Sequence, residues 1–145
     1  MDFALTTVVT TILGRFIFLK RALDSINLQT YKPQKIIIIS QALNKQDQLE
    51  IDLLSDSFDI EVLHIKFPQL IGSQTARYYG LLNTFTKYIH FLDDDDYLFP
   101  EMYSNAKSIF LSNQDINLLS FNAQYSKKNI FNTKLKKLKL TKRKN

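Results

Sequence analysis

The feature that most constrains this chain is an unbroken apolar run, Lys35-Ile-Ile-Ile-Ile-Ser40. Four consecutive isoleucines leave no polar side for solvent, which is typical of a strand buried on both faces of a parallel sheet. Parallel neighbours cannot be joined by a tight turn, so they need crossover connections, which are usually helices. The run therefore predicts an α/β fold with a mainly parallel sheet.

The rest of the chain alternates between strand-like and helix-like segments, as that fold requires. Strands are expected at Phe3–Thr11, Lys35–Ser40, Asp59–Lys66, Tyr88–Leu92 and, as a short fifth, Ile116–Phe121. Helices are expected at Ile17–Ile26, around Leu49–Leu54, from an N-cap at Ser73 to about Thr84, and from Pro100 through Leu111. In such folds ligands bind beyond the carboxyl ends of the strands.

The composition is that of one globular domain. The chain has 145 residues, of which 45% are hydrophobic and 23% charged, and no apolar run is long enough to span a bilayer. Asp2 precedes the first apolar run without a basic segment, so no secretory signal is expected. The absence of cysteine excludes disulfides and thiolate metal sites and predicts a cytoplasmic protein.

The net charge of +5 comes from a basic tail. Residues 127–145 carry nine Lys/Arg and no Asp or Glu, whereas residues 1–126 carry 10 basic and 14 acidic side chains. We therefore divide the chain into a domain, 1–125, and a tail, 126–145. Leu135, Leu138 and Phe131 would form one face of a cationic amphipathic helix suited to the anionic inner face of a membrane. The alternative is a disordered tail; nucleic-acid binding is not expected, because the body is acidic and carries no recognition motif.

Four aspartates, Asp93 to Asp96, directly follow the strand expected at Tyr88–Leu92. Adjacent carboxylates repel one another, so a compact arrangement needs a cation, and oxygen ligands suit Mg²⁺ or Mn²⁺. Asp93 and Asp95 point the same way if the extended conformation continues through them. The alternative interpretation is a solvated acidic loop.

Two further polar groups are expected near the same edge of the sheet. Arg77 lies near the start of a helix, where the helix dipole disfavours a cation unless an anion is close; a diphosphate or the aspartates would supply one. Thr10 and Thr11 end the first strand, where their hydroxyls would meet a nucleotide base. The alternative interpretations are a surface arginine and structural threonines.

Taken together, these segments resemble the nucleotide-sugar-binding half of a family 2 glycosyltransferase of the GT-A fold. The blocks that carry the resemblance are Val8-Val-Thr-Thr11 with Arg15, Phe18-Leu-Lys-Arg-Ala-Leu-Asp-Ser-Ile26 with Gln29-Thr-Tyr31, Lys35-Ile-Ile-Ile-Ile39, Gly72 to Leu81, and Lys87-Tyr-Ile-His-Phe-Leu-Asp-Asp-Asp-Asp96 with Pro100. The resemblance extends from about Phe3 to Phe121. It implies a Rossmann-like three-layer sandwich that lacks the acceptor-binding half, in an apparently truncated chain.

The resemblance also implies a role for each matched residue. Asp93 and Asp95 would form the D-x-D pair that holds Mn²⁺ or Mg²⁺ and, through it, the diphosphate of a nucleotide-sugar donor. Thr11 would lie near the base and Arg77 near the base or ribose, with Asp93 and Asp94 also binding substrate. The activity implied is glycosyl transfer to a saccharide or lipid-linked acceptor in polysaccharide biosynthesis, in the cytoplasm or at the inner membrane face.

Three departures from the family pattern stand against full activity. Ser40-Gln41 replaces an aspartate that usually follows the second strand, Tyr78 replaces an asparagine, and no Asp or Glu follows Asp115, so the usual general base has no counterpart. The alternative function is therefore a non-catalytic nucleotide-sugar-binding remnant or accessory protein. A nucleotidyltransferase is less consistent with the sequence, because no glycine-rich phosphate loop follows the first strand.

Overall fold

The computed structural model describes residues 3–121 and 123 of the chain. Two compact units are distinguished, residues 1–113 and residues 114–145, and all of the regular elements described here belong to the first. In chain order they are β1 (Leu5–Ile12), α1 (Phe16–Asn27), β2 (Lys35–Gln41), α2 (Lys45–Ser55), β3 (Glu61–Phe67), α3 (Ser73–Leu82), β4 (Tyr88–Asp93) and α4 (Met102–Ser112).

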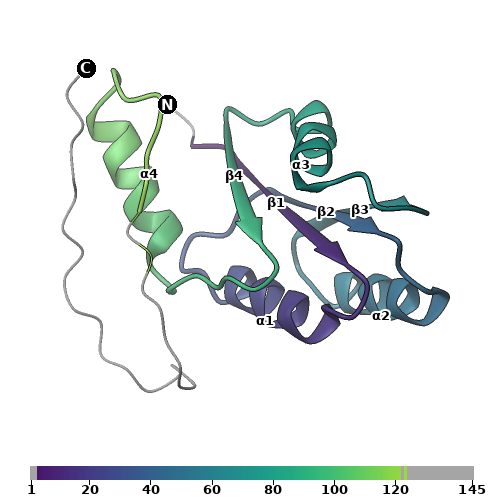
Figure 1. Cartoon of the computed structure of the whole chain (residues 1–145). Coiled ribbons are helices and arrows are strands. Elements are labelled where there is room, and N and C mark those ends of the chain that lie inside the picture. Colours follow the sequence, from purple (N-terminus) through teal and green to yellow (C-terminus); the bar gives the residue numbers. More distant parts are fainter. Residues whose placement is uncertain (1–2, 122, 124–145) are drawn as a thin grey trace. The chain divides into compact units, whose positions relative to one another are not determined.

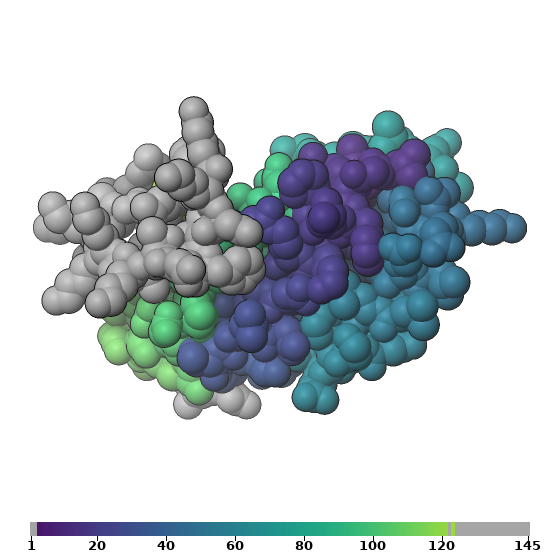
Figure 2. Space-filling model, turned by 90° about the horizontal axis from the view of Figure 1, so that it is seen from below, coloured from purple at the N-terminus to yellow at the C-terminus, as the bar shows by residue number. Residues whose placement is uncertain are grey.

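The four strands form one parallel sheet in the order β3-β2-β1-β4. Figure 1 shows α3 on one side of this sheet and α1 and α2 on the other, which gives three layers. In the space-filling view from below, indigo and blue atoms, the colours of α1 and α2, form much of the surface that faces the viewer (Figure 2). The predicted α/β fold with a mainly parallel sheet is confirmed.

The apolar run in β2 forms the centre of the core. Its four isoleucines, Ile36 to Ile39, are all 0% exposed, because β2 lies between β1 and β3 with a helix layer on each side. On the α3 side, Ile37 and Ile39 pack with Val8 of β1 and Ala76 of α3. On the other side, the apolar stripe of α1 is buried at Leu19, Ala22, Leu23 and Ile26.

The helix α3 lies unusually close to β1 at Gly80. A Cβ atom at this position would stand 2.4 Å from Cγ1 of Val8, well inside the contact distance of two carbon atoms. Only glycine allows the helix backbone to approach the strand this closely. The close approach matters for function because α3 carries Arg77 to the same edge of the sheet as the aspartates.

The structure corrects two predicted helix starts. Gly72, with φ 83°, occupies the N-cap of α3, so Ser73 is its first helical residue. Pro100 lies in the turn before α4, which begins at Met102 behind the N-cap Glu101. Neither N-cap residue makes a side-chain capping hydrogen bond, and both helix starts differ from the expected ones by one or two residues.

The fifth strand predicted at residues 116–121 is wrong. The segment is irregular and pairs with no other strand among the described residues. A segment rich in apolar residues forms a strand only when a neighbouring strand supplies hydrogen-bonding partners. None of the described helices has the length and apolarity needed to cross a membrane. The tail interpretations, on Phe131, Leu135 and Leu138, lie outside the described residues.

Candidate functional site

The carboxyl ends of β1, β2 and β4 meet at one edge of the sheet and form a cleft with the start of α3. Its volume is about 470 Å³. The lining residues are Thr10, Thr11, Ile12, Arg15, Gln41, Leu70, Gly72, Ser73, Arg77, Asp93, Asp94 and Asp95. The structure thus brings together all five residues that the sequence singled out: Thr11, Arg77, Asp93, Asp94 and Asp95.

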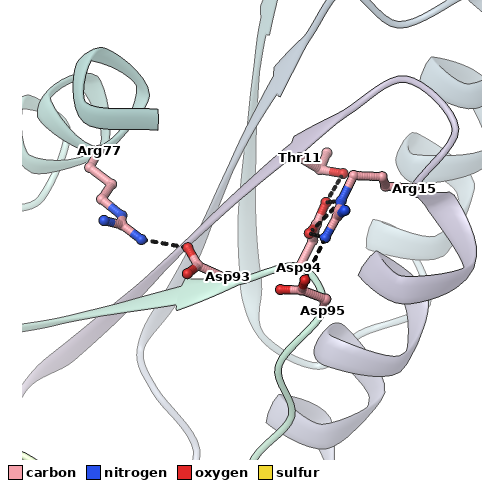
Figure 3. Close-up of polar contacts among 6 residues, drawn as sticks. All are labelled: Thr11, Arg15, Arg77, Asp93, Asp94 and Asp95. Carbon is pink, nitrogen blue, oxygen red and sulfur yellow. Dashed lines mark hydrogen bonds and ion pairs between the residues drawn. The ribbon is translucent and has the colours of Figure 1, made fainter. Parts of the chain in front are cut away.

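Asp93 and Asp94 point to opposite sides of the sheet, where they meet different partners. Asp93, the last residue of β4, faces the α3 side, where Nη2 of Arg77 donates to its Oδ1 at 2.5 Å. Asp94 faces the α1 side, where it meets Thr11 and Arg15 (Figure 3). The sequence expectation that the aspartates would supply an anionic partner for Arg77 agrees with this geometry.

Asp94 is the most enclosed charge in the cleft, with 6% of its side chain exposed. Arg15 donates from Nε to both carboxylate oxygens, at 2.8 and 2.9 Å, and from Nη2 to Oδ1 at 2.6 Å. The Thr11 hydroxyl donates to Oδ2 at 2.7 Å. The hydrogen bonds that Arg15 itself makes to Asp94 and then to Asp95 hold the pKa of its guanidinium above its usual range. Both carboxylate oxygens of Asp94 are therefore occupied by protein partners.

Asp95 does not lie on the same side as Asp93, because the extended conformation ends at Asp93. The N–H of Asp96 donates to the carbonyl of Asp93 at 3.1 Å and closes a turn. The turn sends Asp95 to Arg15, whose Nη2 lies 2.9 Å from its Oδ2, and leaves its side chain 56% exposed. The expectation that Asp93 and Asp95 point the same way is corrected: each pairs with a different arginine.

The aspartates still repel one another. The pKa of Asp96 is raised, first by its partial burial and then by the negative charges of Asp95, Asp93 and Asp94. Two arginines, from the β1–α1 loop and from α3, supply part of the neutralising charge that the sequence analysis assigned to a metal ion. Four carboxylates against two guanidinium groups leave a negative balance, so the cluster still favours a further cation.

The donor atoms suit a divalent metal whose coordination a ligand completes. Asp93 and Asp95 each give one oxygen to an arginine, so each retains a second oxygen for another partner. In the described part of the chain, no three His, Cys, Asp or Glu side chains are grouped to hold a metal by themselves. Mg²⁺ is commonly bound through one or two carboxylates together with substrate phosphates. Asp93 and Asp95 each offer one free carboxylate oxygen of this kind, but from the two different sides on which their arginine partners lie.

Two cleft residues had no role in the sequence analysis. Arg15 was noted only as part of a motif, and Gln41 only as a departure from one. Gln41 ends β2, and Arg15 lies in the loop that follows the carboxyl end of β1. That position was the signal that could have drawn attention to them. Tyr78, the other departure, is 57% exposed and is not among the residues that line the cleft.

Comparisons with known proteins give a family and a set of structural neighbours. The family model described as "Glycosyl transferase family 2" matches residues 7–144. The structure of S. aureus TarS 1-349 in complex with UDP has a TM-score of 0.70 at 15% identity, covering 90% of this chain and 40% of that one. The complex of the same fragment with UDP-GlcNAc has a TM-score of 0.67 at 16% identity, covering 90% and 38%.

A third structure, described as S. aureus TarS without a residue range, has a TM-score of 0.62 at 16% identity, covering 75% of this chain and 20% of that one. No curated protein matches the chain significantly. The likeness to TarS confirms the fold, and this chain spans no more than 40% of the length of these neighbours.

Proposed function

The chain belongs to glycosyl transferase family 2, and from this membership we propose that its cleft binds the diphosphate and nucleoside of a nucleotide-sugar donor. The observation that carries the proposal is the pairing of three cleft aspartates with two arginines at the carboxyl ends of parallel strands. Such a site offers cations to phosphate oxygens and carboxylates to a divalent metal. The TarS structures solved with UDP and with UDP-GlcNAc support the same class of ligand.

Some cleft residues would contact the ligand directly, and others would hold those residues in position. Arg77 and Arg15 are each about one-third exposed, so both offer part of a guanidinium to a diphosphate in the cleft while their pairs with the aspartates are kept. Asp93 and Asp95 would hold Mg²⁺ or Mn²⁺, which when bound offsets the negative charge that develops on the departing nucleoside diphosphate. The expected direct contacts of Thr11 with the base and of Asp94 with the substrate are revised in this proposal. Both residues act through Arg15, because the carboxylate of Asp94 is enclosed by Arg15 and by the hydroxyl of Thr11.

The full reaction in this proposal is transfer of the sugar to a saccharide or lipid-linked acceptor. A second candidate is binding of the nucleotide sugar without transfer, and one observation favours it. Among the described residues that line the cleft, each carboxylate is paired with an arginine. Because the second oxygens of Asp93 and Asp95 are assigned here to the metal, no cleft carboxylate is left over to deprotonate an acceptor hydroxyl. Sugar transfer by the purified chain, measured against donor hydrolysis in water, separates the two candidates.

The binding proposal is tested by calorimetric titration of a nucleoside diphosphate in Mn²⁺ and in EDTA. We expect binding to weaken at least about tenfold in EDTA, because the leftover carboxylate charge then repels the diphosphate. Asp95→Ala should cause a similar loss in Mn²⁺ without unfolding the domain, since the Asp95 side chain is 56% exposed.

The matched control is Asp59→Ala, which removes an exposed carboxylate outside the cleft and should leave binding unchanged. Equal affinity with and without metal would contradict the metal assignment. No binding of any nucleoside diphosphate in either buffer would contradict the proposed function itself.

A further inference from the structure

Helix α2 buries little apolar surface against the sheet. Ile51 is its one buried residue, whereas α1 buries five. Leu49 and Leu53, which also lie on α2, are 53% and 62% exposed. A segment with few buried apolar contacts opens locally at a low cost in free energy. The polar contacts between α2 and the sheet therefore matter more than they do for the other helices.

His64 of β3 makes such a polar contact and extends it to the neighbouring strand. Its Nδ1 lies 2.7 Å from Oδ1 of Asp52 in α2, and its Nε2 lies 2.8 Å from Oγ of Ser40 in β2. A carboxylate only accepts hydrogen bonds, so this arrangement assigns the hydrogen to Nδ1 and makes Nε2 the acceptor of the Ser40 hydroxyl. The neutral imidazole thus uses both of its nitrogens to connect α2 with β2.

The same three side-chain types form the catalytic triad of serine hydrolases, but this chain of contacts is not arranged for catalysis. Ser40 is 1% exposed, so its hydroxyl cannot reach a substrate. The Ser40 hydroxyl also has no acceptor other than Nε2 of His64 among the described residues. What the three residues provide is a link that depends on the protonation state of one ring.

A second proton on His64 is incompatible with these contacts. Nε2 would then meet the Ser40 hydroxyl as donor against donor. Two charged groups act on the ring: Asp52 from α2, and Lys66 from β3, whose Nζ lies 2.5 Å from the Asp52 carboxylate. Because Lys66 already neutralises that carboxylate, a charged His64 side chain, only 6% exposed, would be poorly compensated. Burial accordingly lowers the pKa of His64 from its ordinary 6.5, against the opposing hydrogen bond and charge of Asp52.

We propose that His64 is a pH switch for the docking of α2: the neutral ring holds the helix on the sheet, and protonation in mild acid releases it. In the released form the imidazole reaches water and takes up the proton without a donor conflict. The contribution of His64 is complete above pH 6.5 and is lost as the pH falls below that value, because the released form binds the proton more readily. Since α1 buries five residues of its own, the release is confined to α2.

The test is hydrogen–deuterium exchange of the α2 amides at pH 7.5 and pH 5.0, corrected for the intrinsic pH dependence of exchange. In the unmodified chain we expect the protection of α2 to fall at least about threefold between these pH values. His64→Gln cannot take up a proton, so its α2 should be equally protected at both. The matched control is His90→Gln, which removes the other histidine of the chain, a partner of Tyr103, and should keep the fall.

A second variant decides the test if His64→Gln loosens α2 at both pH values. Lys66→Gln leaves the Asp52 carboxylate to His64 alone, so the ratio of α2 protection between pH 7.5 and pH 5.0 should shrink. Circular dichroism checks that all three variants fold. The proposal is overturned if α2 of the unmodified chain is equally protected at both pH values, or if His64→Gln shows the same fall as the unmodified chain. Loss of the fall in His90→Gln, or an unchanged ratio in Lys66→Gln, would overturn it as well.

Discussion

Replacing Arg15 with alanine should cost far more stability than removing an exposed charge from the same helix. The substitution deletes all three nitrogen–oxygen hydrogen bonds that Arg15 makes to the carboxylate of Asp94, whose side chain is 6% exposed. Arg15 is the N-cap residue of α1 but makes no capping hydrogen bond with its side chain. The expected loss of stability therefore comes from the broken ion pair and not from loss of a helix cap.

The magnitude follows from the surroundings of the pair. Hydrogen bonds to a charged group are worth about 1.5–3 kcal/mol each, but three that share one guanidinium do not add. Breaking a buried ion pair from one side costs about 3–5 kcal/mol. Arg15 is itself 32% exposed and the Thr11 hydroxyl remains, so we expect the lower end, about 3 kcal/mol. For a chain of this size that corresponds to a fall in Tm of about 10 °C.

The assay is urea unfolding at pH 7.5 followed by far-ultraviolet circular dichroism. The matched control is Lys20→Ala, which removes the exposed pair between Lys20 and Asp24 on the same helix and should cost about 0.5 kcal/mol or less. Arg15→Lys keeps the charge but not the forked geometry and should fall between the two. If Arg15→Ala costs no more than Lys20→Ala, the enclosed pair does not contribute as argued.

Two further outcomes are expected from packing and from burial. Gly80→Ala should destabilise the domain by about 1–3 kcal/mol despite the better helix propensity of alanine, because the new Cβ would meet Val8 at 2.4 Å. Val8→Ala should reduce that loss in the double variant; additive losses in urea unfolding would show that the contact is not responsible. Burial lowers the pKa of His90 from 6.5 to about 4, so the unfolded chain takes up a proton that the folded chain does not as the pH falls below 6.5. Stability should therefore drop by about 3 kcal/mol between pH 6.5 and 4, and His90→Gln should remove this part of the pH dependence; an identical pH profile in the variant would refute the assignment.

The local pattern of apolar residues was sufficient to predict the four strands and the helices between them. The isoleucines of β2 needed burial on two faces wherever they lay, and an alternation of strands with helices allows few arrangements other than a parallel sheet. The cleft could be placed for the same reason, since the carboxyl ends of parallel strands share one edge. Asp93 to Asp95, Thr11 and Arg77 were therefore expected near one another before any contact was known.

Which charges pair was decided by the tertiary structure alone. Arg15 and Asp94 are 79 residues apart in the chain, and no periodicity connects them. The turn after Asp93 separates Asp93 from Asp95, and the amide of Gln41 is oriented by a loop that follows β3. Residues 116–121 are rich in apolar side chains, as a strand would be, but have no strand partner among the described residues. Hydrophobic patterning acts along the chain, so sequence reveals it, whereas hydrogen bonds and ion pairs depend on distances in space that only the folded chain sets.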